Sequence, residues 1–95
     1  MEVKEAITVA KSYIADIFGP EGAFNVGLEE VQFDGDKSLW SVTIGFSRPW
    51  DRPVVQNALL PQAEKRTYKI VEIDDFNERV VGVRNRMIDS IRTAL

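Results

Sequence analysis

Near the start of the chain, apolar side chains recur at alternating steps of four and three residues, and this spacing constrains the fold more than any other feature. It places them on one face of a helix; they are Val3, Ile7, Ala10, Ile14 and Ile17. Gly19 and Pro20 follow, and a left-handed glycine before a proline is typical of a helix end. The pattern therefore predicts an amphipathic helix over residues 2–18. Because a lone helix of this length is marginal in water, we expect it to cover another element.

The segment 38–48 alternates between large apolar and small polar side chains, as a half-buried strand does. The large residues are Trp40, Val42, Ile44 and Phe46, and we expect their side to face the helix. Segment 26–34 predicts the preceding strand, with a tight turn at Asp34-Gly35-Asp36 between the two. Within it, the apolar parity changes between Leu28 and Val31, which predicts a bulge near Glu29-Glu30.

A second hairpin is predicted from segments 66–74 and 78–85, around Asp75-Phe76-Asn77. Its first strand carries apolar residues of both parities. Val71 and Ile73 share one side, and Tyr68 and Ile70 share the other. Only one pair can face the helix, so the opposite side of the sheet is either partly covered or an interface.

The C-terminal segment, residues 86–95, predicts a short helix with Met87, Ile88, Ile91 and Leu95 on one face. We therefore expect a single α+β domain over residues 1–95: an N-terminal helix packed on a four-stranded antiparallel sheet of two hairpins, then a short C-terminal helix. Ninety-five residues leave no room for a second domain, and an apolar content of 44% is ample for a core.

Between the hairpins, residues 48–64 form a long connection that is too apolar for a disordered tract. We expect an ordered loop, and two interpretations stay open: a lid over the sheet's second face, or an epitope that presents Trp50 between Arg48 and Arg52. Trp and Arg are enriched at binding hot spots. The candidate partner-binding residues, from this loop and the outward pair of the second hairpin, are Arg48, Trp50, Asp51, Arg52, Leu59, Leu60, Tyr68 and Ile70.

Common catalytic and metal chemistry has few residues to use here. The chain has no Cys and no His, which excludes thiol nucleophiles, His-based triads and the usual zinc sites. The aspartates of the two predicted turns lack the spacing of a calcium loop. An acid–base site could be built from Asp51, Arg48 and Tyr68, but nothing in their spacing requires it. We expect no catalytic, cofactor-binding or metal-binding residue and no enzymatic activity.

The net charge of −3 is divided unevenly: residues 1–47 carry 3 basic and 8 acidic side chains, and residues 48–95 carry 9 and 7. This balance disfavours nucleic acid as a partner and suits contact with a protein. The N-terminus lacks the apolar core of a signal peptide, and no apolar stretch approaches the ~20 residues that cross a bilayer. With no cysteine for disulfides, we expect a cytoplasmic protein without a membrane partner.

The stretch YKIVEIDDFNERVVGVRNR, residues 68–86, resembles the paired strands of PepSY-type domains, in which an Ile-Asp before a turn is followed by a valine-rich return strand. The resemblance covers about a fifth of the chain. It implies a small α+β module of a kind associated with restraining peptidases, typically outside the cytoplasm. The chain departs from the family at Phe76-Asn77-Glu78, where a Thr-Gly turn is common, and in lacking a signal peptide. A helix followed by meandering strands is also similar to cystatin-like and NTF2-like folds.

Apolar side chains of outward parity beside a Trp-bearing loop favour a non-enzymatic protein-binding or regulatory module, which could form a homodimer or dock another protein. The alternative is a small-molecule-binding or enzymatic pocket protein of the cystatin-like or NTF2-like kind. That alternative predicts a cavity lined by Trp40, Phe46 and Tyr68, between the helix and a curved sheet.

Overall fold

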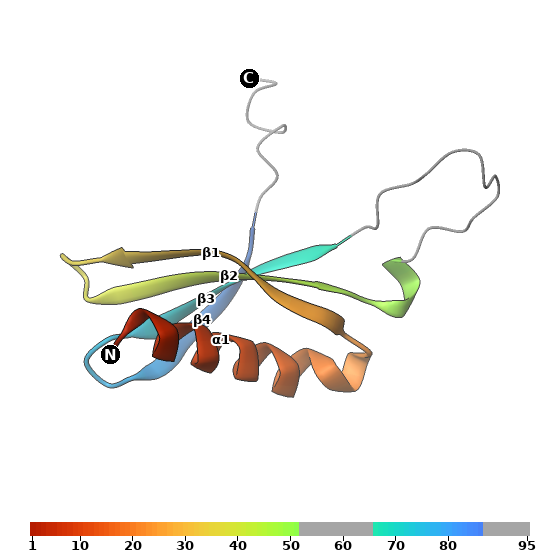
Figure 1. Ribbon diagram of the computed structural model, residues 1–95, viewed down its shortest axis with the longest axis horizontal. Helices are drawn as coiled ribbons and strands as arrows, with labels where there is room; N and C mark the ends of the chain where they lie inside the picture. The colour runs from red at the N-terminus through yellow and green to blue at the C-terminus, as the bar shows by residue number, and fades with distance from the viewer. Residues whose placement is uncertain (52–65, 87–95) are drawn as a thin grey trace, which may run out of the picture.

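The computed structural model describes residues 1–51 and 66–86, which form one helix packed on a four-stranded antiparallel sheet (Figure 1). The strands lie in the order β1-β2-β3-β4. The elements are helix α1 (Val3–Phe18), 3₁₀ helix η1 (Gly19–Glu21), strands β1 (Phe24–Asp34) and β2 (Leu39–Ser47), 3₁₀ helix η2 (Pro49–Asp51), and strands β3 (Thr67–Asp74) and β4 (Arg79–Asn85). The predicted α+β architecture is confirmed. The predicted C-terminal helix and positions 52–64 of the predicted loop lie outside the described residues.

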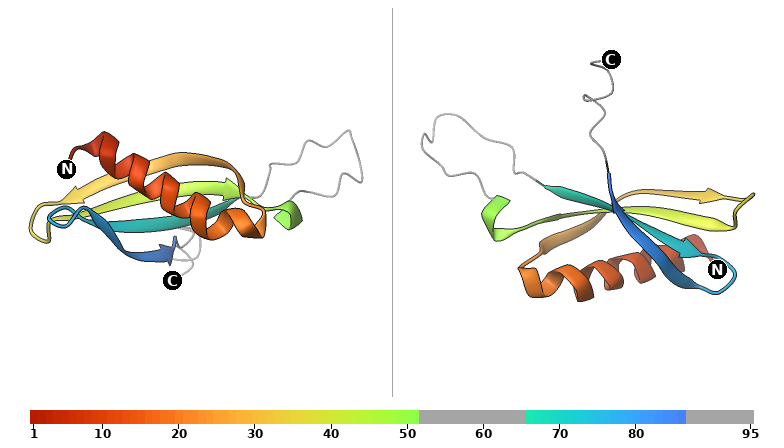
Figure 2. Two further views of the ribbon diagram at one scale, coloured as in Figure 1. Left: turned by 90° about the horizontal axis from the view of Figure 1, so that it is seen from below. Right: turned by 180° about the vertical axis from the view of Figure 1, so that it is seen from behind.

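The core lies between α1 and the face of the sheet that it covers (Figure 2). Alternate positions of the two central strands are completely buried there: Val42, Ile44 and Phe46 of β2, with Val71 and Ile73 of β3. The predicted orientation of segment 38–48 is therefore correct. Each large aliphatic side chain buried in this way contributes roughly 1.5–3 kcal/mol to the free energy of folding.

Helix α1 buries a slightly different stripe from the one predicted. Its fully buried residues are Ala6, Ala10 and Ile14, whereas Val3 and Ile17 stay exposed. Val3 and Ile17 lie in the first and last turns, where Met1 and Phe18 pack against the core instead. The two alanines are small enough to let the helix approach the sheet closely.

Helix α1 ends at Phe18 as predicted, but the conformation of the glycine that follows differs from the prediction. Gly19 is not left-handed; its φ of −56° continues the helical conformation, and the chain runs on into η1. The left-handed residue is Gly22, with φ +89°. A Cβ atom at Gly22 would lie 2.8 Å from the ring of Pro49, so a glycine is required both by the backbone and by the close approach of the chain after β2.

Both edge strands contain irregularities. The pairing of β1 with β2 shifts between Leu28 and Glu30, which leaves Glu29 as the extra residue and confirms the predicted bulge. A second shift lies between Phe24 and Gly27. On the other edge, β4 shifts against β3 at Val81, whereas the central pairing of β2 with β3 is regular.

The two hairpin turns are built alike and lie at the same end of the sheet. In each, the aspartate that ends the first strand, Asp34 or Asp74, accepts a hydrogen bond from the backbone N–H two residues later. In each, the residue before the return strand is left-handed although it is not glycine: Ser38 has φ 51° and Glu78 has φ 55°. The Asp75 N–H donates to the Ser38 carbonyl at 2.9 Å, which ties the two turns together.

Candidate functional site: the open face of the sheet

Helix α1 covers one face of the sheet, and within residues 1–51 and 66–86 no helix or strand covers the other (Figure 2). We call this second surface the open face. The pairing registers assign its side chains to all four strands and to the residues that flank β3 and β4. They are Gly27, Glu29, Glu30, Gln32, Asp34, Leu39, Ser41, Thr43, Gly45, Ser47, Arg66, Tyr68, Ile70, Glu72, Asp74, Arg79, Gly82, Arg84 and Arg86.

The centre of the open face is a strip of small β2 residues overhung by larger neighbours. A Cβ atom on Gly45 would lie 2.9 Å from Glu29 Oε2 and 3.0 Å from a ring carbon of Tyr68, so both side chains lean over this glycine. Thr43 is consequently only 2% exposed, although no described element lies over it. Tyr68 is 36% exposed, and Ile70, opposite Thr43, is half-buried.

The prediction that β3 carries apolar side chains on both faces of the sheet is thus confirmed. Val71 and Ile73 are in the core, and Tyr68 and Ile70 lie on the opposite side of the sheet. Long side chains of the face itself cover part of β2, and the interface that the sequence left open stays a prediction.

Charged side chains surround this centre. Among the described residues, every ion pair between two side chains lies on the open face: Arg66 with Glu29 at 4.0 Å, Arg86 with Glu30 at 4.0 Å, and Arg84 with Glu72 at 3.5 Å. Arg66 also donates to Ser47 Oγ and to the Asn25 carbonyl. These long side chains bridge the strands, and Arg66 and Arg86 reach across the inner strands to the carboxylates of β1.

The structure places the other sequence-predicted candidates elsewhere. The guanidinium of Arg48 lies on the helix side, with its Cζ 5.4 Å from the ring centres of Phe18, Phe46 and Trp50. Its Nε is buried and has no hydrogen-bond partner among the described residues. Trp50 follows in η2 and is 63% exposed. Asp51 is the last residue of η2, and Arg52, Leu59 and Leu60 lie outside the described residues.

Arg48 and Trp50 therefore do not join Tyr68 and Ile70 on one surface. This separation also removes the geometry of an acid–base site that would combine Arg48 with Tyr68, because the sheet lies between them.

Lys69 is the second cation at the end of α1. Its ammonium lies 5.3 Å from the Phe18 ring centre and donates a hydrogen bond to Asn85 Oδ1. Burial lowers the pKa of Lys69, and the positive charge of Arg48 lowers it further, while Glu21 acts in the opposite direction. Helix α1 has no basic residue in its last turn. Lys69 of β3 and Arg48, which follows β2, lie beside Phe18 at this end of the helix, where a positive charge is favourable to the helix dipole.

Two hollows flank α1. One, of about 380 Å³, lies by the first turns of the helix and is lined by Met1, Lys4, Glu5, Thr8, Val9 and Glu78. The other, of about 290 Å³, lies by the last turns and is lined by Tyr13, Ile17, Phe18, Lys69, Val83, Arg84 and Asn85. The cavity predicted from Trp40, Phe46 and Tyr68 does not match either. Phe46 is completely buried, and Tyr68 lies on the far face of the sheet.

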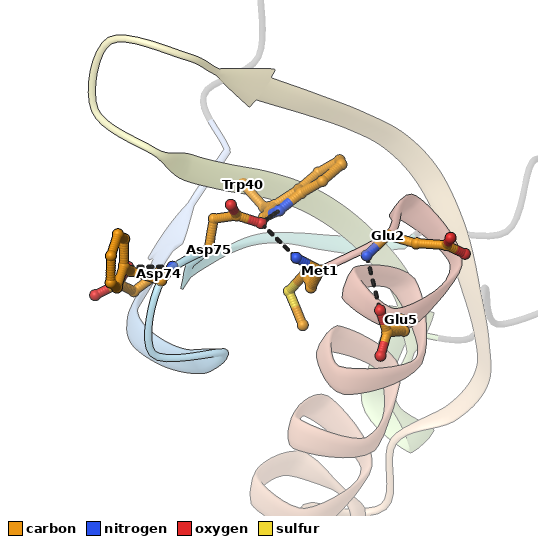
Figure 3. Close-up of polar contacts among 7 residues, drawn as sticks. Met1, Glu2, Glu5, Trp40, Asp74 and Asp75 are labelled. Atoms are coloured by element: carbon orange, nitrogen blue, oxygen red, sulfur yellow. Dashed lines mark hydrogen bonds and ion pairs between the residues drawn. The ribbon is translucent and has the colours of Figure 1, made fainter.

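At the end of the molecule that holds both turns, Asp75 joins three parts of the chain (Figure 3). Its Oδ1 accepts hydrogen bonds from the Met1 ammonium at 2.9 Å and from Trp40 Nε1 at 2.8 Å. The Trp40 indole, and then the ammonium, lower the pKa of Asp75, and the hydrogen bond to Asp75 raises the pKa of the Met1 amino group. The role is structural: it holds the start of α1 against the β3–β4 turn.

Asp74, which ends β3, accepts hydrogen bonds within its own turn. The backbone N–H of Phe76, and then the Asn77 side chain, lower the pKa of Asp74. In the part of the chain that the structure describes, no group of three acidic side chains is placed to hold a metal ion. The same part contains no helix of the length and hydrophobicity that a membrane span requires.

Phe76, at the tip of the β3–β4 turn, is an exposed aromatic residue that the sequence reasoning did not single out. It is 87% exposed, the most exposed large apolar side chain of the described residues. The sequence did carry a signal, because an aromatic residue occupies a turn position where small or polar residues are usual.

Comparison of the chain with protein-family models, with curated proteins and with solved structures finds no match. The functional argument therefore starts from the geometry of the open face.

Proposed function

We propose that this chain is a non-enzymatic protein-binding module that docks a partner protein on the open face of its sheet. The observation that carries the proposal is the combination of a partly exposed Tyr68 and Ile70 at the centre of that face with a rim of charged pairs. Protein interfaces have this anatomy, with an aromatic or aliphatic centre and a polar edge.

The shape of the open face suits a protein partner better than an enclosed small molecule. After Leu39, strand β2 contributes only small side chains to this face, Ser41, Thr43, Gly45 and Ser47, and neither of the two hollows found among the described residues lies there. Tyrosine is a frequent hot-spot residue because it offers a large contact area at little entropic cost. We therefore assign Tyr68 as the anchor of the interface and the surrounding charges as its determinants of specificity.

The test is affinity capture of partners by three versions of the full chain: the unmodified protein, Tyr68→Ala and Phe76→Ala. Phe76 is the matched control, since it is also an exposed aromatic residue but belongs to the turn at the end of the sheet. We expect Tyr68→Ala to weaken capture by at least about tenfold, as hot-spot truncations do, and Phe76→Ala to leave it unchanged. Thermal unfolding of each variant separates lost binding from lost folding.

A fourth variant, Trp50→Ala, distinguishes the two surfaces that the sequence grouped together. Capture that survives Tyr68→Ala but is lost with Trp50→Ala would move the interface to the helix side and contradict the proposal.

A further inference from the structure

We infer that the partner of the open face is a second copy of this chain, packed face to face about a two-fold axis that runs parallel to the strands. This inference rests on the proposed function and names the partner for the same surface. It follows from how charge is distributed across the four strands.

The two edges of the open face carry opposite charge. Strand β1 contains three acidic side chains, Glu29, Glu30 and Asp34, and no basic one. Strand β4 and the residue after it contain Arg79, Arg84 and Arg86 and no acidic side chain. Because β1 and β4 are the outer strands of the sheet, the face is acidic along one edge and basic along the other.

Such a face is complementary to itself in one orientation only. When two sheets stack, a two-fold axis parallel to the strands brings β1 of one copy over β4 of the other, so that acidic and basic edges meet twice. An axis perpendicular to the strands brings β1 over β1 and β4 over β4, and like charges then oppose one another. Isologous interfaces repeat each contact in this way, and stacked sheets lie about 10 Å apart, a gap that Glu and Arg side chains can span.

The same axis also brings the centres of the two open faces together. It passes between β2 and β3, the middle strands, and therefore sets β2 of one copy opposite β3 of the other. Ile70 and Tyr68 are the large apolar side chains of β3 on this face, and they then meet the side chains that lean over β2 of the other copy.

The ion pairs within one copy do not oppose this arrangement. Arg86–Glu30 and Arg66–Glu29 are both 4.0 Å long, and their side chains are partly exposed. Loose surface pairs of this kind contribute little to folding, so their side chains are free to exchange partners between copies.

The experiment uses two variants with reversed edges. Glu29→Arg/Glu30→Arg puts basic side chains on β1 as well as on β4. Arg84→Glu/Arg86→Glu puts acidic side chains at the β4 edge as well as on β1. Masses are measured by light scattering at low salt for the unmodified chain, for each variant and for their equimolar mixture. Lys11→Glu, a charge reversal on the exposed side of α1, is the control.

We expect the unmodified chain and Lys11→Glu to have twice the mass of the 10.8 kDa chain. Each edge variant should dimerise at least about tenfold more weakly, because like charges then meet across the interface, and the mixture should regain the dimer. If a reversal impairs folding in thermal melts, the neutral pairs Glu29→Gln/Glu30→Gln and Arg84→Gln/Arg86→Gln replace it and should weaken the dimer to a smaller degree.

Two outcomes overturn the inference. One is an unmodified chain that stays monomeric at millimolar concentration; if capture still depends on Tyr68, the proposed function stands and the partner is a different protein. The other is a dimer that neither reversal weakens, which would place self-association on another surface.

Discussion

Asp75 links three parts of the chain, because one of its oxygens accepts hydrogen bonds from both the Met1 ammonium and the Trp40 indole. Both contacts join segments far apart in sequence: the start of α1, the start of β2 and the β3–β4 turn. A single side chain therefore fixes the position of the helix along the sheet. The two pKa shifts at this contact have opposite directions, which makes its contribution to stability measurable.

The first prediction concerns pH. The lowered pKa of Asp75 adds stability that is present above its ordinary pKa of about 4 and is lost as pH falls through the folded value. The raised pKa of the Met1 amino group adds stability that is present below about 8 and is lost as pH rises through the folded value. Urea unfolding should therefore give the largest difference between the unmodified chain and Asp75→Asn from about pH 4 to 8, shrinking on both sides.

Asp36→Asn is the control, because Asp36 is exposed in the other turn. Glu5 and Glu78 also face the amino group, so some of the alkaline loss should persist in Asp75→Asn. Parallel stability curves for the unmodified chain and Asp75→Asn would contradict the assignment.

The second prediction concerns Ser38, whose φ of 51° is unfavourable for any residue with a Cβ atom. Ser38→Gly should raise the free energy of unfolding by about 0.5–1 kcal/mol, since it relieves this strain. Ser38→Ala keeps the Cβ atom and should give no such gain. Equal melting temperatures for Ser38→Gly and Ser38→Ala would show that the turn is not strained at this position.

Among the elements, the junction after α1 depends on a single glycine. Gly22 turns the chain from η1 into β1 with φ +89°, and the ring of Pro49 fills the space where a Cβ atom would lie. Gly19, three residues earlier, has helical φ and no atom within 4 Å of its Cβ position. The position of Gly22 therefore requires a glycine, whereas the position of Gly19 can accept a larger residue.

The third prediction uses this pair. Gly22→Ala should lower the free energy of unfolding by about 1–3 kcal/mol, because both the backbone and the Pro49 contact resist a methyl group. Gly19→Ala should be neutral or stabilising by up to about 1 kcal/mol, since alanine favours helical conformation. Thermal melts should resolve this, as 1 kcal/mol shifts the melting temperature of such a domain by about 4–8 °C. A melting temperature that is lower for Gly19→Ala than for Gly22→Ala would contradict these roles of the two glycines.

The sequence could predict elements because each has a local periodic signal. The parity of Trp40 to Phe46 identified the buried side of β2, and the parity change after Leu28 located the bulge in β1. The end of α1 at Phe18 was predicted correctly, but the left-handed conformation expected of Gly19 was wrong for a physical reason. A glycine before a proline suits a helix end, but the chain takes one more 3₁₀ turn, and the left-handed position is set by the distant Pro49.

For the whole molecule, sequence parity separated Tyr68 from Val71. The same parity puts Arg48, two residues after Phe46, on the helix side of the sheet, so the grouping of Arg48 with Tyr68 and Ile70 in one interface went against it. The open face was hard to foresee, because the bulge at Glu29 decides which β1 carboxylates lie beside the basic side chains of β4. The uneven charge of the two halves was visible in the sequence, but its layout across one face was not. The resemblance to PepSY-type domains stays a prediction.

The register shifts in β1 and β4 have a consequence for how this protein avoids uncontrolled assembly. A sheet edge with a regular ladder of free N–H and C=O groups is a template on which further strands can add without limit. Both outer strands here break that ladder, at Glu29 and at Val81, while the inner pairing is regular. Growth of fibrils along the hydrogen-bonding direction is thereby discouraged at both edges of the sheet.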